Sequence, residues 1–148
     1  MANGAPVLVQ RVLGARWAWP IDGGLRFIDG RPLFGRSKTA RGVALSVLAT
    51  TIAAPLLNLP IELGALVGML AMAGDLISSF IKRRLGLAPS RQAIGLDQIP
   101  ESLLPMLGCR SLLPLDFDEI ALGTVIFLLG ELALSRLFYR LKLRERPY

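Results

Sequence analysis

The sequence contains no histidine and a single cysteine, Cys109, among its 148 residues. The absence of histidine excludes Ser-His-Asp catalysis, histidine-ligated zinc and acid–base catalysis by an imidazole. One cysteine cannot form a disulfide within the chain. Any metal ion must therefore be held by oxygen ligands, a coordination that suits magnesium.

Charged residues are also scarce, at 19% of the chain, whereas 53% of the residues are hydrophobic and the mean hydropathy is +0.53. Soluble domains carry about 25% charged residues. The apolar residues occur in long blocks, which is typical of a small multispanning membrane protein. The length allows one unit, so we expect residues 1–148 to form a single integral membrane domain.

Four apolar segments predict an all-α polytopic bundle with about four transmembrane helices, spanning about 43–59, 61–81, 96–115 and 119–141. The first segment has 17 residues, which as a helix extend about 25 Å. Proline and glycine recur throughout residues 1–42. This region is therefore predicted to be a basic cytoplasmic loop, with short helical or reentrant pieces.

The 17 lysines and arginines give the orientation. They cluster in 11–41, 82–91 and 136–146, which four crossings place on one side, and only Arg110 lies near the other side. The positive-inside rule makes the clustered side cytoplasmic. We therefore expect a multi-pass protein of the cell's inner (cytoplasmic) membrane with its site facing the cytoplasm. The net charge of +6 is then explained by topology, and no nucleic-acid partner is expected.

The most informative segment is 74–84, where an apolar stretch carries one carboxylate and then ends in three consecutive cations. A carboxylate inside a membrane helix is costly and suggests a functional site. Asp75, Ser79 and Lys82 follow one another at helical spacing, so they share one face of a helix. They could hold a metal ion and the phosphates that it bridges. The alternative is an Asp75 ion pair with a neighbouring helix, with the cations marking the membrane edge.

A second carboxylate, Asp97, opens the next apolar segment, and Pro100 suits the first turn of a helix there. Asp97 is then expected at the same membrane depth as Asp75, and the two carboxylates could ligate Mg2+ together. The alternative is that Asp97 only caps the helix.

The basic loop interleaves glycines with Lys38, Thr39 and Arg41, side chains that could bind phosphate oxygens. It is not a Walker loop, because the Gly-Lys-Ser/Thr ending is missing. The alternative is that its cations bind the anionic head groups of membrane lipids.

An ordered set of motifs over residues 2 to about 110 resembles the CDP-archaeol synthase family of membrane cytidylyltransferases, which is related to the phosphatidate cytidylyltransferases. The motifs are Ala2-Asn3…Pro6-Val7, Pro20-Ile21-Asp22, Asp29-Gly30-Arg31…Phe34-Gly35…Lys38-Thr39-Ala40-Arg41-Gly42, Gly74-Asp75…Ser79-Phe80-Ile81-Lys82-Arg83-Arg84 and Leu96-Asp97-Gln98.

The resemblance implies that a lipid phosphate attacks the α-phosphate of CTP, giving a CDP-lipid (CDP-archaeol or CDP-diacylglycerol type) and pyrophosphate, with Mg2+ as cofactor. It implies Asp75, Asp97 and Lys82 as catalytic residues, with the metal on Asp75 and Asp97. It implies a CTP- and phosphate-binding pocket of Asn3, Asp22, Asp29, Lys38, Thr39, Arg41, Ser79, Arg83, Arg84 and Gln98. A homodimer is also expected from related enzymes.

The chain departs from this family in starting directly at the Ala-Asn…Pro motif, where members usually have a preceding transmembrane helix. Two other functions are alternatives to the cytidylyltransferase. One is a small four-helix transporter that uses an intramembrane carboxylate, although a minimal transporter would not need the 42-residue loop. The other is an inactive homologue that lacks the first helix.

Overall fold

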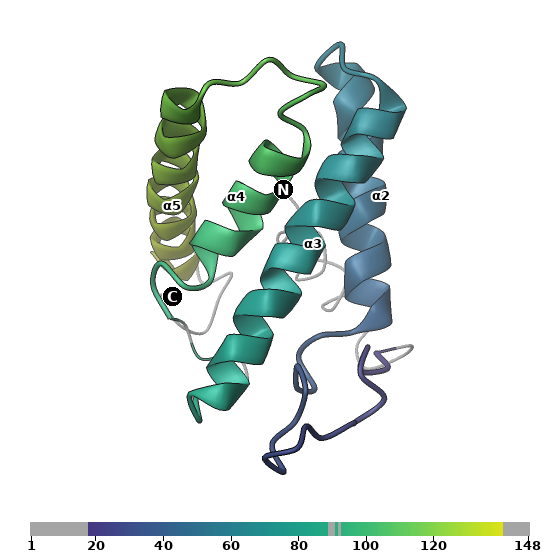
Figure 1. Ribbon diagram of the computed structural model, residues 1–148, viewed down its shortest axis with the longest axis vertical. Coiled ribbons are helices and arrows are strands. Elements are labelled where there is room, and N and C mark those ends of the chain that lie inside the picture. Colours follow the sequence, from purple (N-terminus) through teal and green to yellow (C-terminus); the bar gives the residue numbers. More distant parts are fainter. Residues whose placement is uncertain (1–17, 89–90, 92, 141–148) are drawn as a thin grey trace.

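The computed structural model describes residues 18–88, 91 and 93–140 of the chain. Its helices are α2 (Ala40–Leu56), α3 (Ile61–Arg84), α4 (Gln98–Gly108) and α5 (Phe117–Arg140). They pack in chain order, α3 lying between α2 and α4 and α5 lying outside against α4 (Figure 1). Within the described residues, extended pairing is limited to two isolated β-bridges, so the predicted all-α class is confirmed.

In the part of the chain that the structure describes, two helices are long and apolar enough to cross a membrane, α3 and α5, with 24 residues each. A helix of this length extends about 36 Å, more than the hydrocarbon core of about 30 Å. The apolar α2 is shorter, with 17 residues, and ends one residue after Pro55. The number of four spans stays a prediction.

The third apolar segment forms a much shorter helix than the predicted range of 96–115. Helix α4 has 11 residues, which extend about 16 Å. It ends at Gly108, and the chain then turns: the amides of Leu112 and Leu113 both donate to the Cys109 carbonyl. Two prolines, Pro105 inside the helix and Pro114 beyond it, lack the N–H that a continuous helix would use.

Glycines let α3 approach both neighbours closely. A Cβ built on Gly68 would lie 2.2 Å from Thr50 Oγ1 of α2, and one on Gly74 would lie 2.2 Å from the Pro100 carbonyl oxygen of α4. Small residues at such crossings are typical of membrane helix pairs, because packing there depends on close van der Waals contact. The contact at Gly74 brings the start of α4 beside Asp75.

The loop before α2 has a defined fold. The Ile21 amide donates to the Lys38 carbonyl at 2.8 Å and the Ala40 amide donates to the Trp19 carbonyl at 3.1 Å, so the two ends of the loop are joined. Thr39 caps α2 by accepting from the Gly42 amide at 3.1 Å. The loop lies below α2, beside the end of α3 (Figure 1).

Candidate functional site

The loop is organised around Asp22, which is 6% exposed. Its carboxylate accepts hydrogen bonds from the backbone amides of Gly24, Phe34 and Gly35 at 3.0, 3.0 and 3.1 Å. Burial raises the pKa of Asp22, the backbone donors lower it, and the net pKa lies below the ordinary value of 3.8. Gly35 has φ of 93°, a conformation that other residues rarely adopt. Asp22 therefore acts on the loop backbone.

Arg84 attaches this loop to the end of α3. It donates to Asp29 Oδ1 at 2.9 Å and to the Pro32 carbonyl at 2.6 Å. Its guanidinium carbon also lies 4.8 Å from the ring centres of both Phe27 and Phe80. Hydrogen bonds to a charged group and cation–π contacts reinforce one another here. Two residues predicted to bind CTP, Asp29 and Arg84, thus bind each other.

Arg31, which is not among the predicted site residues, makes the reciprocal attachment. Its guanidinium donates to the carbonyls of Arg83 and Arg84, the last carbonyls of α3, which have no partner within the helix. The guanidinium also passes 3.5 Å from where a Cβ of Gly86 would lie. The signal was present in the Asp-Gly-Arg motif, but a motif does not reveal which element its arginine contacts.

The cation nearest the end of the loop, Lys38, reaches the carboxylate within α3. Lys38 Nζ lies 2.6 Å from Asp75 Oδ1 and 2.5 Å from Oδ2. The side chains are 21% and 13% exposed. Two residues predicted for the site, from a loop and from a membrane helix, are thereby brought together.

The second ion pair joins α3 to the start of α4. Lys82 Nζ lies 2.5 Å from Asp97 Oδ1, with side-chain exposures of 9% and 19%. Asp97 occupies the N-cap position of α4, but its side chain makes no capping hydrogen bond; Oδ2 accepts from the Ala93 amide at 3.0 Å instead. Asp75 and Lys82 are seven residues apart, so both ion pairs lie along about 10 Å of α3.

Arg83, between Lys82 and Arg84, is buried at 4% exposure. Its Nη2 donates to the Ala88 carbonyl at 3.0 Å. Nε and Nη1 are buried and meet no hydrogen-bond acceptor in the part of the chain that the structure describes. Buried donors without an acceptor are costly, and a guanidinium offers them in the geometry that binds phosphate oxygens.

The remaining predicted residues have local roles or stay unassigned. Gln98, 1% exposed, accepts from the Gly95 amide at 2.8 Å through its side-chain oxygen. Ser79 is buried on α3, and Arg41 is partly buried in the first turn of α2. Asn3 lies outside the described residues. The roles predicted for these residues stay predictions.

The acidic residues fit one kind of metal site. No group of three or more His, Cys, Asp or Glu residues gathers within the described ranges, so a cage made by the protein alone is not present there. Mg2+ commonly keeps several waters and binds through one or two carboxylates together with substrate phosphates. Two carboxylates, Asp75 and Asp97, each paired with a lysine, are compatible with that second mode.

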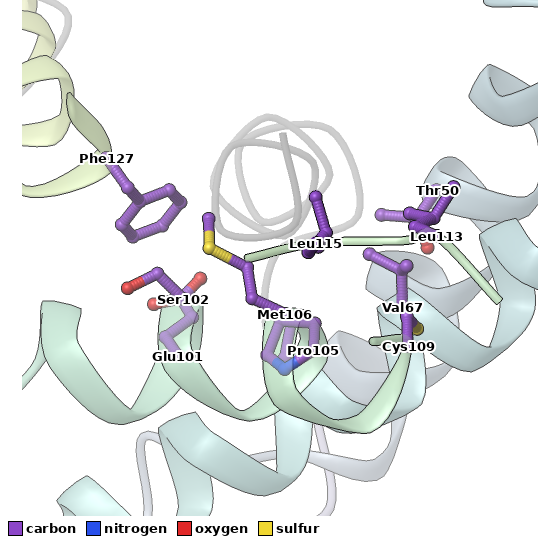
Figure 2. A pocket seen from close by; sticks show the side chains of 11 residues that line it. Thr50, Val67, Glu101, Ser102, Pro105, Met106, Cys109, Leu113, Leu115 and Phe127 are labelled. Atoms are coloured by element: carbon purple, nitrogen blue, oxygen red, sulfur yellow. The ribbon is translucent and has the colours of Figure 1, made fainter. Parts of the chain in front are cut away.

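A cavity of about 260 Å3 lies elsewhere, among α2, α3, α4, α5 and the 109–116 connection. Figure 2 shows Phe127 of α5 facing Glu101, Ser102 and Met106 of α4 across it. The lining is mainly apolar, and none of the predicted site residues belongs to it. The ion pairs and this cavity are therefore distinct features.

Comparisons with known proteins identify relatives of this chain. A family model described as CarS-like CDP-archaeol synthase matches residues 56–148. A curated CDP-archaeol synthase of Pyrobaculum arsenaticum is 36% identical over 100% of this chain and 92% of its own length. One of Pyrococcus furiosus is 33% identical over 99% and 90%. A solved intramembrane enzyme for archaeal membrane lipid biosynthesis superposes with a TM-score of 0.70 at 30% identity, covering 90% of this chain and 85% of that one.

These findings confirm the resemblance and the expectation of a membrane enzyme of the cytidylyltransferase class. They give no support to the transporter or to the inactive homologue. Because the family model matches residues 56–148 and these relatives align with nearly all of the chain, the chain belongs to the CarS-like CDP-archaeol synthase family.

Proposed function

We propose that the chain transfers CMP from CTP to the phosphate of an archaeol-type lipid, giving CDP-archaeol and pyrophosphate in phospholipid biosynthesis. The observation that carries the proposal is the Lys38–Asp75 pair. It unites a basic loop, which a soluble nucleotide can reach, with a carboxylate in a helix long enough to span the membrane. A reaction between a nucleotide and a lipid needs such a boundary.

The reaction itself requires little acid–base chemistry. A phosphate oxygen of the lipid attacks the α-phosphorus of CTP, the bond to the bridging oxygen of the β-phosphate breaks, and pyrophosphate leaves. Catalysis of such transfers depends on in-line positioning and on neutralising charge. A chain without histidine is suited to it.

We assign Mg2+ to Asp75 and Asp97, where it would neutralise phosphate charge when bound. Lys38, Lys82 and Arg83 would hold the phosphates, and the two buried N–H groups of Arg83 without an acceptor among the described residues support this role. Arg84, Asp29 and Asp22 act on the loop that presents Lys38, so we assign them positioning roles. This refines the list of CTP ligands that the resemblance implies.

The orientation follows from the charges. We propose that the loop and the end of α3 face the cytoplasm, because residues 11–41 and 82–91 carry 11 of the 17 lysines and arginines and because CTP is a cytoplasmic substrate. The homodimer expected from related enzymes stays a prediction.

The test is CMP transfer by the purified protein in detergent, with CTP labelled in its α-phosphate and with Mg2+. The acceptors are an archaeol-type ether lipid phosphate, a diacyl phosphatidic acid and the two corresponding phosphate-free lipids. We expect label in the ether lipid phosphate, none in the phosphate-free lipids and none after chelation. Label in no lipid phosphate would contradict the proposal, and preference for the diacyl acceptor would correct the lipid class.

A further inference from the structure

Both carboxylates assigned to the metal already have a cation, and in each case it comes from another element. Lys38 of the loop lies between 2.5 and 2.6 Å from both oxygens of Asp75 in α3. Lys82 of α3 lies 2.5 Å from Asp97, which precedes α4. Each ammonium therefore already contacts a carboxylate oxygen that a divalent ion would need as a ligand.

The net charge of these four side chains disfavours binding of a divalent ion by itself. Two carboxylates and two ammonium groups sum to zero, and all four side chains are at most 21% exposed. A divalent ion that entered alone would displace an ammonium and leave two uncompensated positive charges in a poorly hydrated place. Uncompensated buried charge is strongly unfavourable. A triphosphate that entered with the ion would supply the anionic partner that each displaced lysine needs.

We propose, building on the proposed function, that Lys38 and Lys82 are exchangeable counter-ions of the metal-binding carboxylates. Before CTP arrives they neutralise Asp75 and Asp97, and they transfer to phosphate oxygens when the divalent ion and the nucleotide bind together. Lysine suits this exchange, because its ammonium is a point charge on a flexible stem. The nucleotide-free protein therefore binds divalent ions weakly, and nucleotide and ion raise each other's affinity reciprocally.

The test measures the affinity of Mn2+, a spectroscopic substitute for Mg2+, for nucleotide-free protein in detergent by electron paramagnetic resonance. We expect Lys38→Met and Lys82→Met each to tighten Mn2+ binding by about tenfold or more, because each frees a carboxylate. The matched control is Arg36→Met, which removes one exposed cation of the same loop. It should change the affinity by less than about twofold, because exposed charges are screened.

A second variant shows where the ion goes. Adding Asp75→Asn to Lys38→Met should remove the gain in Mn2+ affinity, since the freed carboxylate is then lost. Circular dichroism and thermal unfolding in detergent confirm that each variant is folded; if Lys38→Met unfolds, Lys38→Gln takes its place. Unchanged Mn2+ affinity in both lysine variants, or an equal gain in Arg36→Met, would overturn the proposal.

The two proposals fail separately. If the wild-type protein transfers CMP but the lysine variants bind Mn2+ no better, the counter-ion role is wrong and the enzymatic function stands. If no lipid phosphate accepts CMP, the proposed function is wrong. The Mn2+ titration of the nucleotide-free protein still reports whether the lysines compete with the metal ion for the carboxylates.

Discussion

Helices α3 and α5 are alike as sequences and differ in what surrounds them. Each has 24 residues and is long and apolar enough to span a membrane, yet 39% of the apolar stretch of α3 is buried inside the protein, against 11% of that of α5. Helix α3 packs on both α2 and α4, whereas α5 packs on α4. Length and hydropathy therefore identify a span without telling whether it faces lipid or protein.

Their polar residues differ accordingly. On α3, Asp75, Lys82 and Arg84 each contact a residue outside the helix. On α5, side chains such as Leu122, Ile126 and Leu129 are about 60% exposed, as expected of a surface toward lipid chains. Charged side chains are tolerated in a membrane helix where they face other protein groups and not lipid. Substitutions should therefore have large effects on α3 and small ones on α5.

The largest expected effect is at Asp75. Asp75→Asn keeps the shape but removes the charge that Lys38 and the metal ion require, so we expect CMP transfer to fall by more than about 100-fold with the protein still folded. The control is Glu62→Gln at the exposed start of the same helix, which should retain activity. Full activity in Asp75→Asn would rule out a metal or transition-state role.

Two glycine substitutions, one on α3 and one on α5, test the packing difference directly. A Cβ at Gly74 of α3 would meet the Pro100 carbonyl oxygen at 2.2 Å, whereas one at Gly130 of α5 would meet nothing within 4 Å. Gly74→Ala should cost about 1–3 kcal/mol of stability and reduce activity, because α4 carries Asp97. Gly130→Ala should be neutral or slightly stabilising. Thermal unfolding in detergent compares them, and equal midpoints would contradict the packing.

Two arginine substitutions extend the comparison to the ends of α3 and α5. Arg84→Lys keeps the charge but cannot reproduce the hydrogen bonds to Asp29, Arg31 and Pro32 together with the cation–π contacts to two rings, so we expect a loss of about 1–2 kcal/mol. Hydrogen exchange in residues 22–35 should become faster. Arg140→Lys at the exposed end of α5 should change neither. A higher KM for CTP without faster exchange would instead make Arg84 a direct phosphate ligand.

The smallest expected effect is the pH dependence of stability that Asp22 contributes. The folded-state pKa of Asp22 is lowered below 3.8, so its stabilisation is complete above that value and is lost as the pH falls through the folded pKa. Asp22→Asn should therefore lower thermal stability at neutral pH and flatten its pH dependence below about pH 4. Unfolding midpoints measured from pH 7 to pH 3 would show this. An unchanged acid slope would contradict the role of Asp22.

Much of the fold could be predicted because membrane helices are recognised in a sequence by their long apolar runs. The ranges of α3 and α5 agree closely with the predicted 61–81 and 119–141. Helix α4 occupies only 98–108 of the predicted range 96–115, since hydropathy does not reveal the turns that begin after Gly108. The roles of Arg31 and Arg84 could not be read either, because composition does not distinguish a cation that binds a ligand from one that binds a loop.

By itself, the sequence determined the membrane class and excluded histidine-ligated metal sites, since these follow from hydropathy and residue types alone. Only the tertiary structure decided which cation meets which carboxylate. Lys38 and Asp75 are 37 positions apart, and Lys82 lies on the same helix as Asp75 but pairs with Asp97. Such pairings depend on how closely glycines let α2, α3 and α4 approach and on how the loop folds around Asp22.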